Sequence, residues 1–506
     1  MTLSKLIFSV LFLGMVTLVA QVYQGPAAGS IASGVSVNTN SFTTEPPSKN
    51  FRPKPIKNIF TNSLYAVTDN MLQASAPEGA NYVIDPKIRR TEREINGDFI
   101  LSNNFAGIPD QGFSIPPDPY LAVGPNHILA VVNSRFRIMD KSGTVQKTIA
   151  ASSFYSSTLS GSDPFDPKVV YDQFSQRWIM VWLHVTSSAG YFLVSVSDDS
   201  DPNGVWFNWA LPTHLNGTTS AGNWADYQGV GYDNQALYIT SNQFTFAGNY
   251  NYAKLRIINK ANLFGATPGQ VTWNDLWDIK TGSGINVFTV RPSRHYGTGT
   301  YTLLSTSPYT TGTFVTLYKV SNPITTPTMT AVDIPVTTYN SPNDAGQLGG
   351  SQTIDGGSFY LRNEPVYRDG ILHAVHAVRS GTGNLYSSVR YLSLNTSTNA
   401  VVSDIAMGAD NYFHFYPAVE VDASNNVAIT YTRSGTNEYA GAFYTSKPAD
   451  VSSLTGGKVI KAGNGYYYKT FGGTRNRWGD YNGAWLDPSN TSRIYLLTEY
   501  VASTNT

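Results

Sequence analysis

The stretch Asp166-Pro167-Lys168-Val169-Val170-Tyr171-Asp172 decides the fold, because variants of it recur along the chain. It has the pattern of a short apolar strand that ends in a turn. Three more short strands are expected before residue 212, at 177–183, 191–197 and 205–211. The sequence here predicts a unit of four short strands joined by turns.

The same opening hairpin occurs seven times. Its copies are centred on residues 119, 167, 227, 292, 365, 417 and 481, so the intervals run from 48 to 73 residues. Four antiparallel strands per repeat at this spacing are typical of a β-propeller, in which radial repetition leaves only short, protected edges. Stacked β-sandwich domains would not repeat one hairpin seven times, and a parallel β-helix has a shorter period. The sequence therefore predicts an all-β propeller of seven four-stranded blades.

The last copy of the repeat is shorter than the others. It supplies two strands before the chain stops at Thr506. Two explanations remain open at this point. Either strands from the N-terminal side, such as residues 96–105, close the ring, or the sequence is a fragment.

The N-terminal part of the chain divides into two segments. In residues 1–20, Lys5 precedes an apolar run of about 15 residues that ends at Ala20, which is short for a membrane span of roughly 20. We therefore expect a cleaved signal peptide rather than a membrane anchor. Residues 21–98 are rich in Gly, Ser, Asn and Pro, contain a basic patch at 87–93, and are predicted to be an irregular linker. The propeller is expected to span 99–506.

Composition excludes several classes of function. Only 13% of the 506 residues are charged, about half the usual share, and the net charge is zero. Bulk electrostatics therefore provide no attraction to nucleic acid or to an anionic membrane. The absence of Cys excludes disulfides and thiolate metal sites. No stretch after residue 20 is apolar enough to cross a bilayer, so we expect an exported protein without a membrane span. Export without Cys favours a bacterial envelope or extracellular protein.

Several short motifs resemble a group of secreted, Bacteroidetes-like bacterial β-propeller proteins that is loosely sialidase-like in architecture. The motifs are Phe105-Ala106-Gly107-Ile108, Pro116-Pro117-Asp118, Ala122-Val123-Gly124-Pro125-Asn126-His127 and Arg477-Trp478-Gly479-Asp480-Tyr481. The resemblance covers roughly residues 99–506. It implies a propeller but no assigned reaction, and members often continue past Tyr500 with one more strand.

Charged residues recur where the innermost strand of each repeat would begin, at one mouth of the central channel. These candidate ligand-binding positions are Asp118, Asp166, Asp226, Arg291, Glu364, Tyr416 and Asp480, flanked by Arg362 and Arg477. Neighbouring carboxylates raise one another's pKa, and glycoside hydrolysis needs such a pair. Sialidases likewise bind a carboxylate with several Arg residues and use a Tyr nucleophile. The alternative is that an acid before Pro or Tyr caps backbone amides between blades. Repetition in most blades favours that structural role.

One segment has the beginning of a calcium-binding loop. Asp199, Asp201 and Asn203 alternate before Gly204, and oxygen ligands at such positions suit calcium. However, Pro202 interrupts the pattern, and no Glu stands at its twelfth position. An ordinary hairpin turn is the favoured interpretation. Calcium remains the one cofactor candidate, and none is expected to be required.

These observations lead to two hypotheses on function. The favoured one is an exported, monomeric, non-catalytic module that binds a polysaccharide or a surface protein, at the cell surface or outside the cell, with the periplasm as an alternative. Exposed aromatics could stack on sugar rings, although packing between blades is favoured for Trp206, Trp209, Trp273 and Trp277. The rival hypothesis is a glycoside hydrolase or polysaccharide lyase that uses the carboxylates at the channel mouth.

Overall fold

The structure is a computed structural model. It describes residues 21–44, 98–110, 112, 115–470 and 473–504, together with the backbone of 81–84. The predicted signal peptide and the basic patch at 87–93 lie outside the described residues. None of the helices in the described part of the chain has the length and apolarity needed to cross a bilayer.

Most of the chain forms antiparallel strands, which group into blades. Blade 1 contains β4 (Tyr120–Val123), β5 (His127–Val132), β6 (Arg135–Asp140) and β7 (Val145–Ala150); blade 2 contains β8 (Phe165–Asp172), β9 (Arg177–Val185), β10 (Gly190–Ser197) and β11 (Val205–Pro212). Blade 3 contains β14 (Asn223–Tyr232), β15 (Ala236–Thr245), β16 (Tyr250–Asn259) and β17 (Val271–Trp277). The small hairpin β12 (Leu215–Asn216) and β13 (Thr219–Ser220) connects blades 2 and 3, and α1 (Ala151–Phe154) follows β7.

The second half of the chain repeats this arrangement. Blade 4 contains β18 (Arg291–Pro292), β20 (Tyr301–Thr306), β21 (Thr311–Ser321) and β22 (Thr328–Asn340); blade 5 contains β23 (Val366–Arg368), β24 (Ile371–Ser380), β25 (Tyr386–Asn395) and β26 (Ala400–Gly408). Blade 6 contains β27 (Tyr412–Val421), β28 (Val427–Gly435), β29 (Glu438–Lys447) and β30 (Lys458–Lys461); the C-terminal hairpin is β31 (Gly483–Leu486) and β32 (Ile494–Leu497). Short 3-10 turns lie at η1 (Thr39–Ser41), η4 (Lys260–Asn262) and η5 (Thr382–Asn384).

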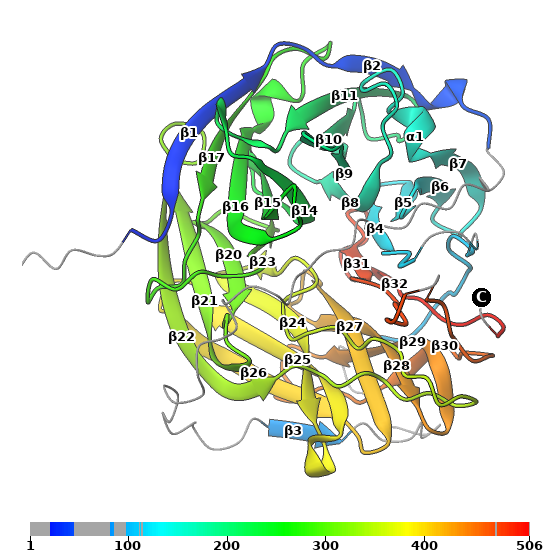
Figure 1. The fold of residues 1–506 in the computed structure, drawn as a ribbon. Coiled ribbons are helices and arrows are strands. Elements are labelled where there is room, and N and C mark those ends of the chain that lie inside the picture. The colour runs from blue at the N-terminus through cyan, green and yellow to red at the C-terminus, as the bar shows by residue number, and fades with distance from the viewer. Residues whose placement is uncertain are drawn as a thin grey trace, which may run out of the picture.

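The blades follow one another around a ring with their first strands innermost (Figure 1). The short strand β19 (Arg294–His295) pairs in parallel with β14 and β23 and so links blades 3 and 5 beside blade 4. Strand β31 contacts both β27 and β4, which closes the ring at the C-terminal hairpin. Residues 98–105, considered as closing strands on the basis of the sequence, are described but form no strand. The ring of antiparallel blades confirms the prediction of an all-β propeller.

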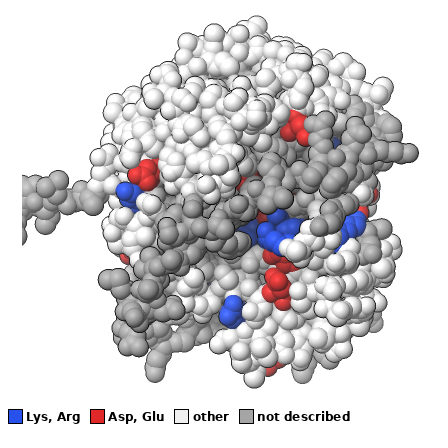
Figure 2. Space-filling view, in the orientation of Figure 1, with Lys and Arg blue, Asp and Glu red and all other residues white. Residues whose placement is uncertain are grey.

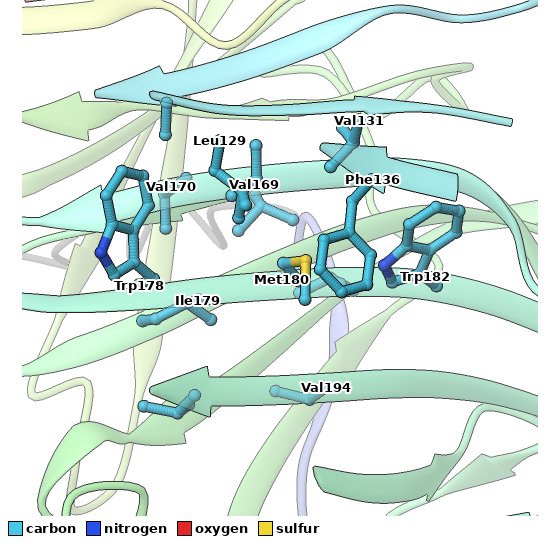
Figure 3. Packing of buried hydrophobic residues seen from close by; sticks show 14 of the residues in the cluster. Leu129, Val131, Phe136, Val169, Val170, Trp178, Ile179, Met180, Trp182 and Val194 are labelled. Atoms are coloured by element: carbon cyan, nitrogen blue, oxygen red, sulfur yellow. The ribbon is translucent and has the colours of Figure 1, made fainter. Parts of the chain in front are cut away.

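Each blade is buried on both faces because a neighbouring blade covers each side. Figure 3 shows Leu129, Val131 and Phe136 of blade 1 beside side chains of β8, β9 and β10, among them Trp178 and Trp182. Strand β9 is accordingly buried along its whole length except at its two ends. Packing on both faces explains why these strands are nearly continuous runs of apolar residues rather than alternating ones.

The N-terminal segment differs from the prediction of an irregular linker. Strand β1 (Gln24–Ile31) pairs with β17, and β2 (Val35–Asn38) pairs with β11, so each adds a fifth strand to the outside of a blade. In Figure 1 these strands follow the outer edge of the ring. The backbone of β3 (Asn81–Ile84) also adds to the outside of a blade, but it pairs with β26 in parallel, whereas β1 and β2 are antiparallel to their partners.

Small residues in β1 and just before β2 are required by the tryptophans beneath them. A Cβ on Gly29 would lie 2.5 Å from the Trp273 ring, and one on Gly34 would lie 2.6 Å from Trp209 Nε1. The composition that suggested a linker therefore reflects close packing of the backbone on aromatic rings. The interpretation of Trp206, Trp209 and Trp273 as packing residues agrees with their burial.

The inner strands share a backbone feature where they pass the channel mouth. Asp118, Asp166, Tyr227 and Tyr416 all have a positive φ, between 49° and 55°. Strands β8, β14 and β27 each have a break in register at this point. Such β-bulges bend a strand and redirect its side chains. The recurring sequence motif therefore marks a bulge in the inner strand.

Candidate functional site

The middle of the channel is filled by a buried ion pair. Lys168 Nζ lies 3.3 Å from Glu364 Oε2, and both side chains are completely buried. Tyr120 donates to the same carboxylate oxygen at 2.7 Å, and the Val230 amide donates to the other oxygen at 3.1 Å. Burial alone would raise the pKa of Glu364, but Lys168 and the nearby Arg291 hold it below its usual value. Glu364, predicted to lie at the mouth, thus connects opposite blades inside the ring.

A second buried pair crosses the channel beside the first. Arg294 donates to Glu420 Oε2 at 2.9 Å and to the carbonyl groups of Ala484 and Val419. The Tyr296 hydroxyl donates to the same Glu420 oxygen at 3.0 Å. These bonds connect β19, β27 and β31. The interior of the channel is therefore a structural network and not an open passage.

Two of the predicted mouth residues bond to the backbone of neighbouring blades. Asp118 accepts from the Asp480 amide at 2.8 Å and from the Asn133 side chain at 2.6 Å. Arg291 donates to the carbonyl groups of Leu361 and Gln228 at 3.0 and 2.8 Å. Both residues are buried. Their contacts match the structural alternative, in which charged groups at the strand starts join adjacent blades.

Asp166 and Asp226 are also buried at the starts of inner strands. The Asp166 amide donates to Asn133 Oδ1 at 2.6 Å, and its carbonyl oxygen accepts from Gln228. Asp226 lies opposite Asn242 in the ladder between β14 and β15. Both residues help to hold the inner strands in place. They are more deeply buried than the arginines Arg362, Arg475 and Arg477 at the channel mouth.

The remaining predicted residues meet in a charged cluster at the channel mouth. Asp480 lies 2.6 Å from Arg477 Nη2 and 3.1 Å from Arg362 Nη1. The Arg362 guanidinium lies 5.6 and 5.3 Å from the ring centres of Tyr227 and Tyr416, which is within cation–π range. The sequence predicts four of these five residues, all except Tyr227, near one mouth of the channel, and the structure brings the four together.

A loop between blades 4 and 5 completes this cluster. Asp355 pairs with Arg475 and lies 4.0 Å from Arg477 Nε, and the Tyr416 hydroxyl donates to the Asp355 carbonyl oxygen at 2.9 Å. The Arg475 side chain is 50% exposed, Arg477 21% and Arg362 12%, so the cluster opens to solvent. We call Tyr227, Asp355, Arg362, Tyr416, Arg475, Arg477 and Asp480 the mouth cluster.

The mouth cluster contains three guanidinium groups and two carboxylates, and the Asp118 carboxylate lies next to it, 2.8 Å from the Asp480 amide nitrogen. Buried Arg362 Nε has no hydrogen-bond partner among the described residues. Figure 2 shows basic and acidic atoms close together near the middle of one face of the ring, on a surface otherwise largely uncharged. Guanidinium groups with unused donors beside tyrosine rings are suited to bind a carboxylate group on a planar or ring-shaped ligand.

Glu499 lies beside this cluster and was not among the predicted site residues. Its Oε1 is buried and has no hydrogen-bond partner in the described part of the chain, and a Cβ on Gly479 would lie 2.7 Å from it. Burial, with the carboxylates of Asp118 and Asp480, raises the pKa of Glu499 well above its usual value.

The candidate calcium loop forms a turn between β10 and β11. Asp199 accepts from the Asp201 amide at 2.7 Å, and Asp201 accepts from the Asn203 amide at 2.8 Å. Such bonds are typical of Asx turns. Within the described residues, no group of three or more His, Asp or Glu side chains is placed to hold a metal ion. Calcium binding at this turn remains a prediction.

Sequence reasoning missed Tyr227, Asp355 and Glu499. Tyr227 has the same positive φ as Asp118, Asp166 and Tyr416 and so is the true equivalent in its repeat, one residue after Asp226. The sequence does not mark it, because Gln228 stands where Pro follows the other three residues. Asp355 and Glu499 lie outside the repeated hairpin. Their position depends on how a loop and the C-terminal segment pack against the ring.

The comparisons with known proteins give only distant structural similarity. No family model and no curated protein matches this sequence. Hadza microbial sialidase Hz136 has a TM-score of 0.39 at 10% identity, over 74% of this chain and 71% of that chain. Trypanosoma rangeli sialidase has a TM-score of 0.34 at 11% identity, over 76% of this chain and 56% of that chain. This chain therefore spans about half of that enzyme's length. The endo-arabinase from Bacteroides thetaiotaomicron VPI-5482 has a TM-score of 0.29 at 12% identity, over 66% of this chain and 94% of that chain. With TM-scores this low, the fold assignment rests on the strand pairing described above.

Proposed function

We propose that this protein is an exported β-propeller that binds a carboxylate-bearing partner, a glycan or a surface protein, at the mouth cluster without cleaving it. We also propose that the C-terminal hairpin counts as an incomplete seventh blade. Residues 1–20 act as the signal peptide in this proposal, and the mature protein works as a monomer at the cell surface or outside the cell.

One observation carries the proposal. Arg362, Arg475 and Arg477 converge on two carboxylates, and Arg475, half exposed, brings this group of guanidiniums to the surface. Guanidinium groups bind carboxylates through paired hydrogen bonds. Tyr227, which lies near Arg362 and is partly buried, provides part of an aromatic ring suited to a sugar, whereas Tyr416 is buried beneath the cluster.

The same contacts argue against catalysis by the predicted carboxylates. Asp118 is bonded to backbone and to Asn133, and Glu364 is engaged by Lys168 and Tyr120 inside the channel. Asp480 already pairs with two guanidinium groups. Each acid is therefore held by partners of its own, whereas an acid–base pair must approach the substrate.

A glycan-processing enzyme is the second candidate, and Glu499 is the observation that favours it. Burial raises the pKa of Glu499 well above its usual value, and a general acid needs a shift in this direction. Asp480 is the ionised carboxylate next to it in this scheme. This candidate predicts product release that depends on both residues.

The first experiment separates the two candidates. Purified protein is run through gels containing neutral or uronic-acid polysaccharides, and the same mixtures are analysed for released oligosaccharides. We expect retardation by the acidic polymers and no products. Arg475→Gln and Arg477→Gln should each weaken retardation at least tenfold.

Arg379→Gln is the matched control, because Arg379 is an exposed arginine outside the mouth cluster. It should behave as the unmodified protein does. Released oligosaccharides that disappear in Glu499→Gln and in Asp480→Asn would overturn the binding hypothesis and support the enzyme.

A further inference from the structure

The C-terminal hairpin leaves one strand edge of the ring without a partner. In blades 1 to 6 a third strand pairs with the second, and these third strands are β6, β10, β16, β21, β25 and β29. The hairpin contains β31 and β32 only, and no described strand pairs with the outer edge of β32. An unpaired strand edge is a template on which another strand can be added.

The register shows which backbone groups point to that edge. The Asp487 amide donates to the Arg493 carbonyl at 2.9 Å, in line with the pairing of Trp485 with Tyr495. In an antiparallel ladder, hydrogen-bonded pairs alternate with non-bonded ones. The N–H and C=O groups of Ile494 and Leu496 therefore face away from β31, toward the open edge.

A large cavity adjoins this open edge. Its volume is about 910 Å³, and we call it the rim slot. Residues 98–107 cross the rim from blade 6 to blade 1: Asp98 pairs with Lys458 at 2.5 Å, and the Gly107 carbonyl accepts from Arg137 at 2.6 Å. The rim slot is lined by this crossing segment and by β32.

The two side walls of the rim slot are apolar. They are formed by Leu121, Ile128, Ala130 and Met139 of blade 1 and by Ala428, Ala442 and Ile460 of blade 6. A third strand in a propeller blade packs against a neighbouring blade on each face. An occupant of the rim slot would accordingly face apolar side chains on both of its faces.

The rim of the slot is basic. Lys461 and Arg493 line it, and neither makes an ion pair with any described residue. Ile100 and Leu101 on the crossing segment are 73% and 41% exposed. These features favour an extended segment with apolar residues in its middle and an acidic residue at its end.

We propose that the rim slot is a docking site for an extended peptide strand of a partner protein, which adds to β32 as a third strand. The open backbone groups of β32 provide the affinity, and the apolar walls select the side chains. The other blades of the same ring show, six times, the geometry of this addition. The proposal does not depend on the mouth cluster.

The test uses a peptide with the sequence of β29, the ten-residue third strand of blade 6. We expect the fluorescently labelled peptide to bind the full chain saturably, measured by anisotropy. The same peptide with Phe443→Pro loses one strand amide and should bind at least tenfold more weakly. Leu101→Asp in the protein should weaken binding at least fivefold. Leu385→Asp, which changes a more exposed leucine on another blade, should leave the binding of the peptide unchanged.

Several results would overturn the proposal. Equal affinity for the peptide with and without proline would show that no strand is added. Binding unaffected by Leu101→Asp would place the peptide elsewhere. Absence of binding, with the protein monomeric by sedimentation, would show that the protein's own chain fills the slot. A dimer that the peptide disperses would identify a second copy, not a partner protein, as the occupant.

Discussion

At the scale of single residues, the Lys168 ammonium group is enclosed at the centre of the ring. It lies 3.3 Å from Glu364, and 4.0 and 3.7 Å from the ring centres of Tyr120 and Tyr481. Removing a charge from water is expensive, and here one carboxylate and two aromatic faces replace the water. The stability of the ring should therefore depend on this pair more than on any surface charge.

The first prediction concerns the loss of one partner. Glu364→Gln leaves the Lys168 charge buried without its carboxylate, which costs about 3–5 kcal/mol of unfolding free energy. Urea denaturation followed by tryptophan fluorescence measures the change. The double variant Glu364→Gln with Lys168→Met removes the stranded charge and should recover most of the loss. A change below about 1 kcal/mol for Glu364→Gln would contradict the burial of this pair.

The second prediction concerns acid stability. Burial, with the positive charges of Lys447 and Arg390 nearby, lowers the pKa of His373 and of His376 to about 3. The unfolded chain binds a proton near pH 6.5, so stability is complete above that pH and falls as the pH drops toward 3. At pH 5 each histidine should lower the free energy of unfolding by about 2 kcal/mol relative to its value at pH 7. Urea midpoints at pH 7 and pH 5 measure the loss.

The matched variant for this prediction removes two of the buried histidines. His373→Gln with His376→Gln should reduce the loss of stability between pH 7 and pH 5 and leave the part due to His295, whose pKa burial also lowers to about 3. If the unmodified protein has the same urea midpoint at pH 7 and at pH 5, these histidines are accessible to solvent and the prediction is wrong.

The repeated charged residues show how far sequence analysis reached at this scale. It located Asp118, Asp166 and Tyr416 at inner strand starts, because Pro follows each of them. It could not separate those that join blades from those that face solvent. That separation depends on the depth of each side chain in the channel, which the repeat does not encode. Asp480 and Glu364 occupy similar positions in the repeat and have different partners.

At the scale of elements, strand β1 explains the small residues near the N-terminus. The sequence pattern predicted blades from residue 99 onward but missed the fifth strands. Strand β1 lacks apolar alternation, and its backbone lies so close to the Trp277 and Trp273 rings that Gly25 and Gly29 have no room for a Cβ. Composition alone cannot distinguish such a strand from a linker.

The third prediction tests this packing. Gly29→Ala places a Cβ 2.5 Å from the Trp273 ring, and overpacking of this kind costs about 1–3 kcal/mol. The melting temperature should fall. Gly297→Ala is the control, because a Cβ there meets nothing within 4 Å. Equal melting temperatures for both variants would mean that β1 does not contact blade 3.

The fourth prediction concerns the turn between β10 and β11. Its carboxylates already accept from the backbone of the turn. We therefore expect the melting temperature to be unchanged by a calcium chelator. A fall that added calcium reverses, and that Asp201→Asn abolishes, would instead establish a calcium site at residues 199–204.

At the scale of the whole molecule, the scarcity of charge is a consequence of the ring. Blades are covered on both faces, so few positions can hold a charge in water. Many of the charges present form buried connections between blades, such as Arg294 with Glu420 and Lys260 with Asp172. The mouth cluster differs, because three of its arginines keep part of their side chains in solvent.

The fifth prediction tests the proposed function most directly. A uronic-acid oligosaccharide and its carboxyl-reduced, neutral counterpart are titrated calorimetrically into the protein and into Arg477→Gln. If the mouth cluster binds the carboxylate, the unmodified protein should prefer the acidic sugar at least tenfold, about 1.4 kcal/mol, and the variant should lose this preference. Equal affinity for both sugars, or a preference that survives in Arg477→Gln, would contradict carboxylate recognition at the mouth cluster.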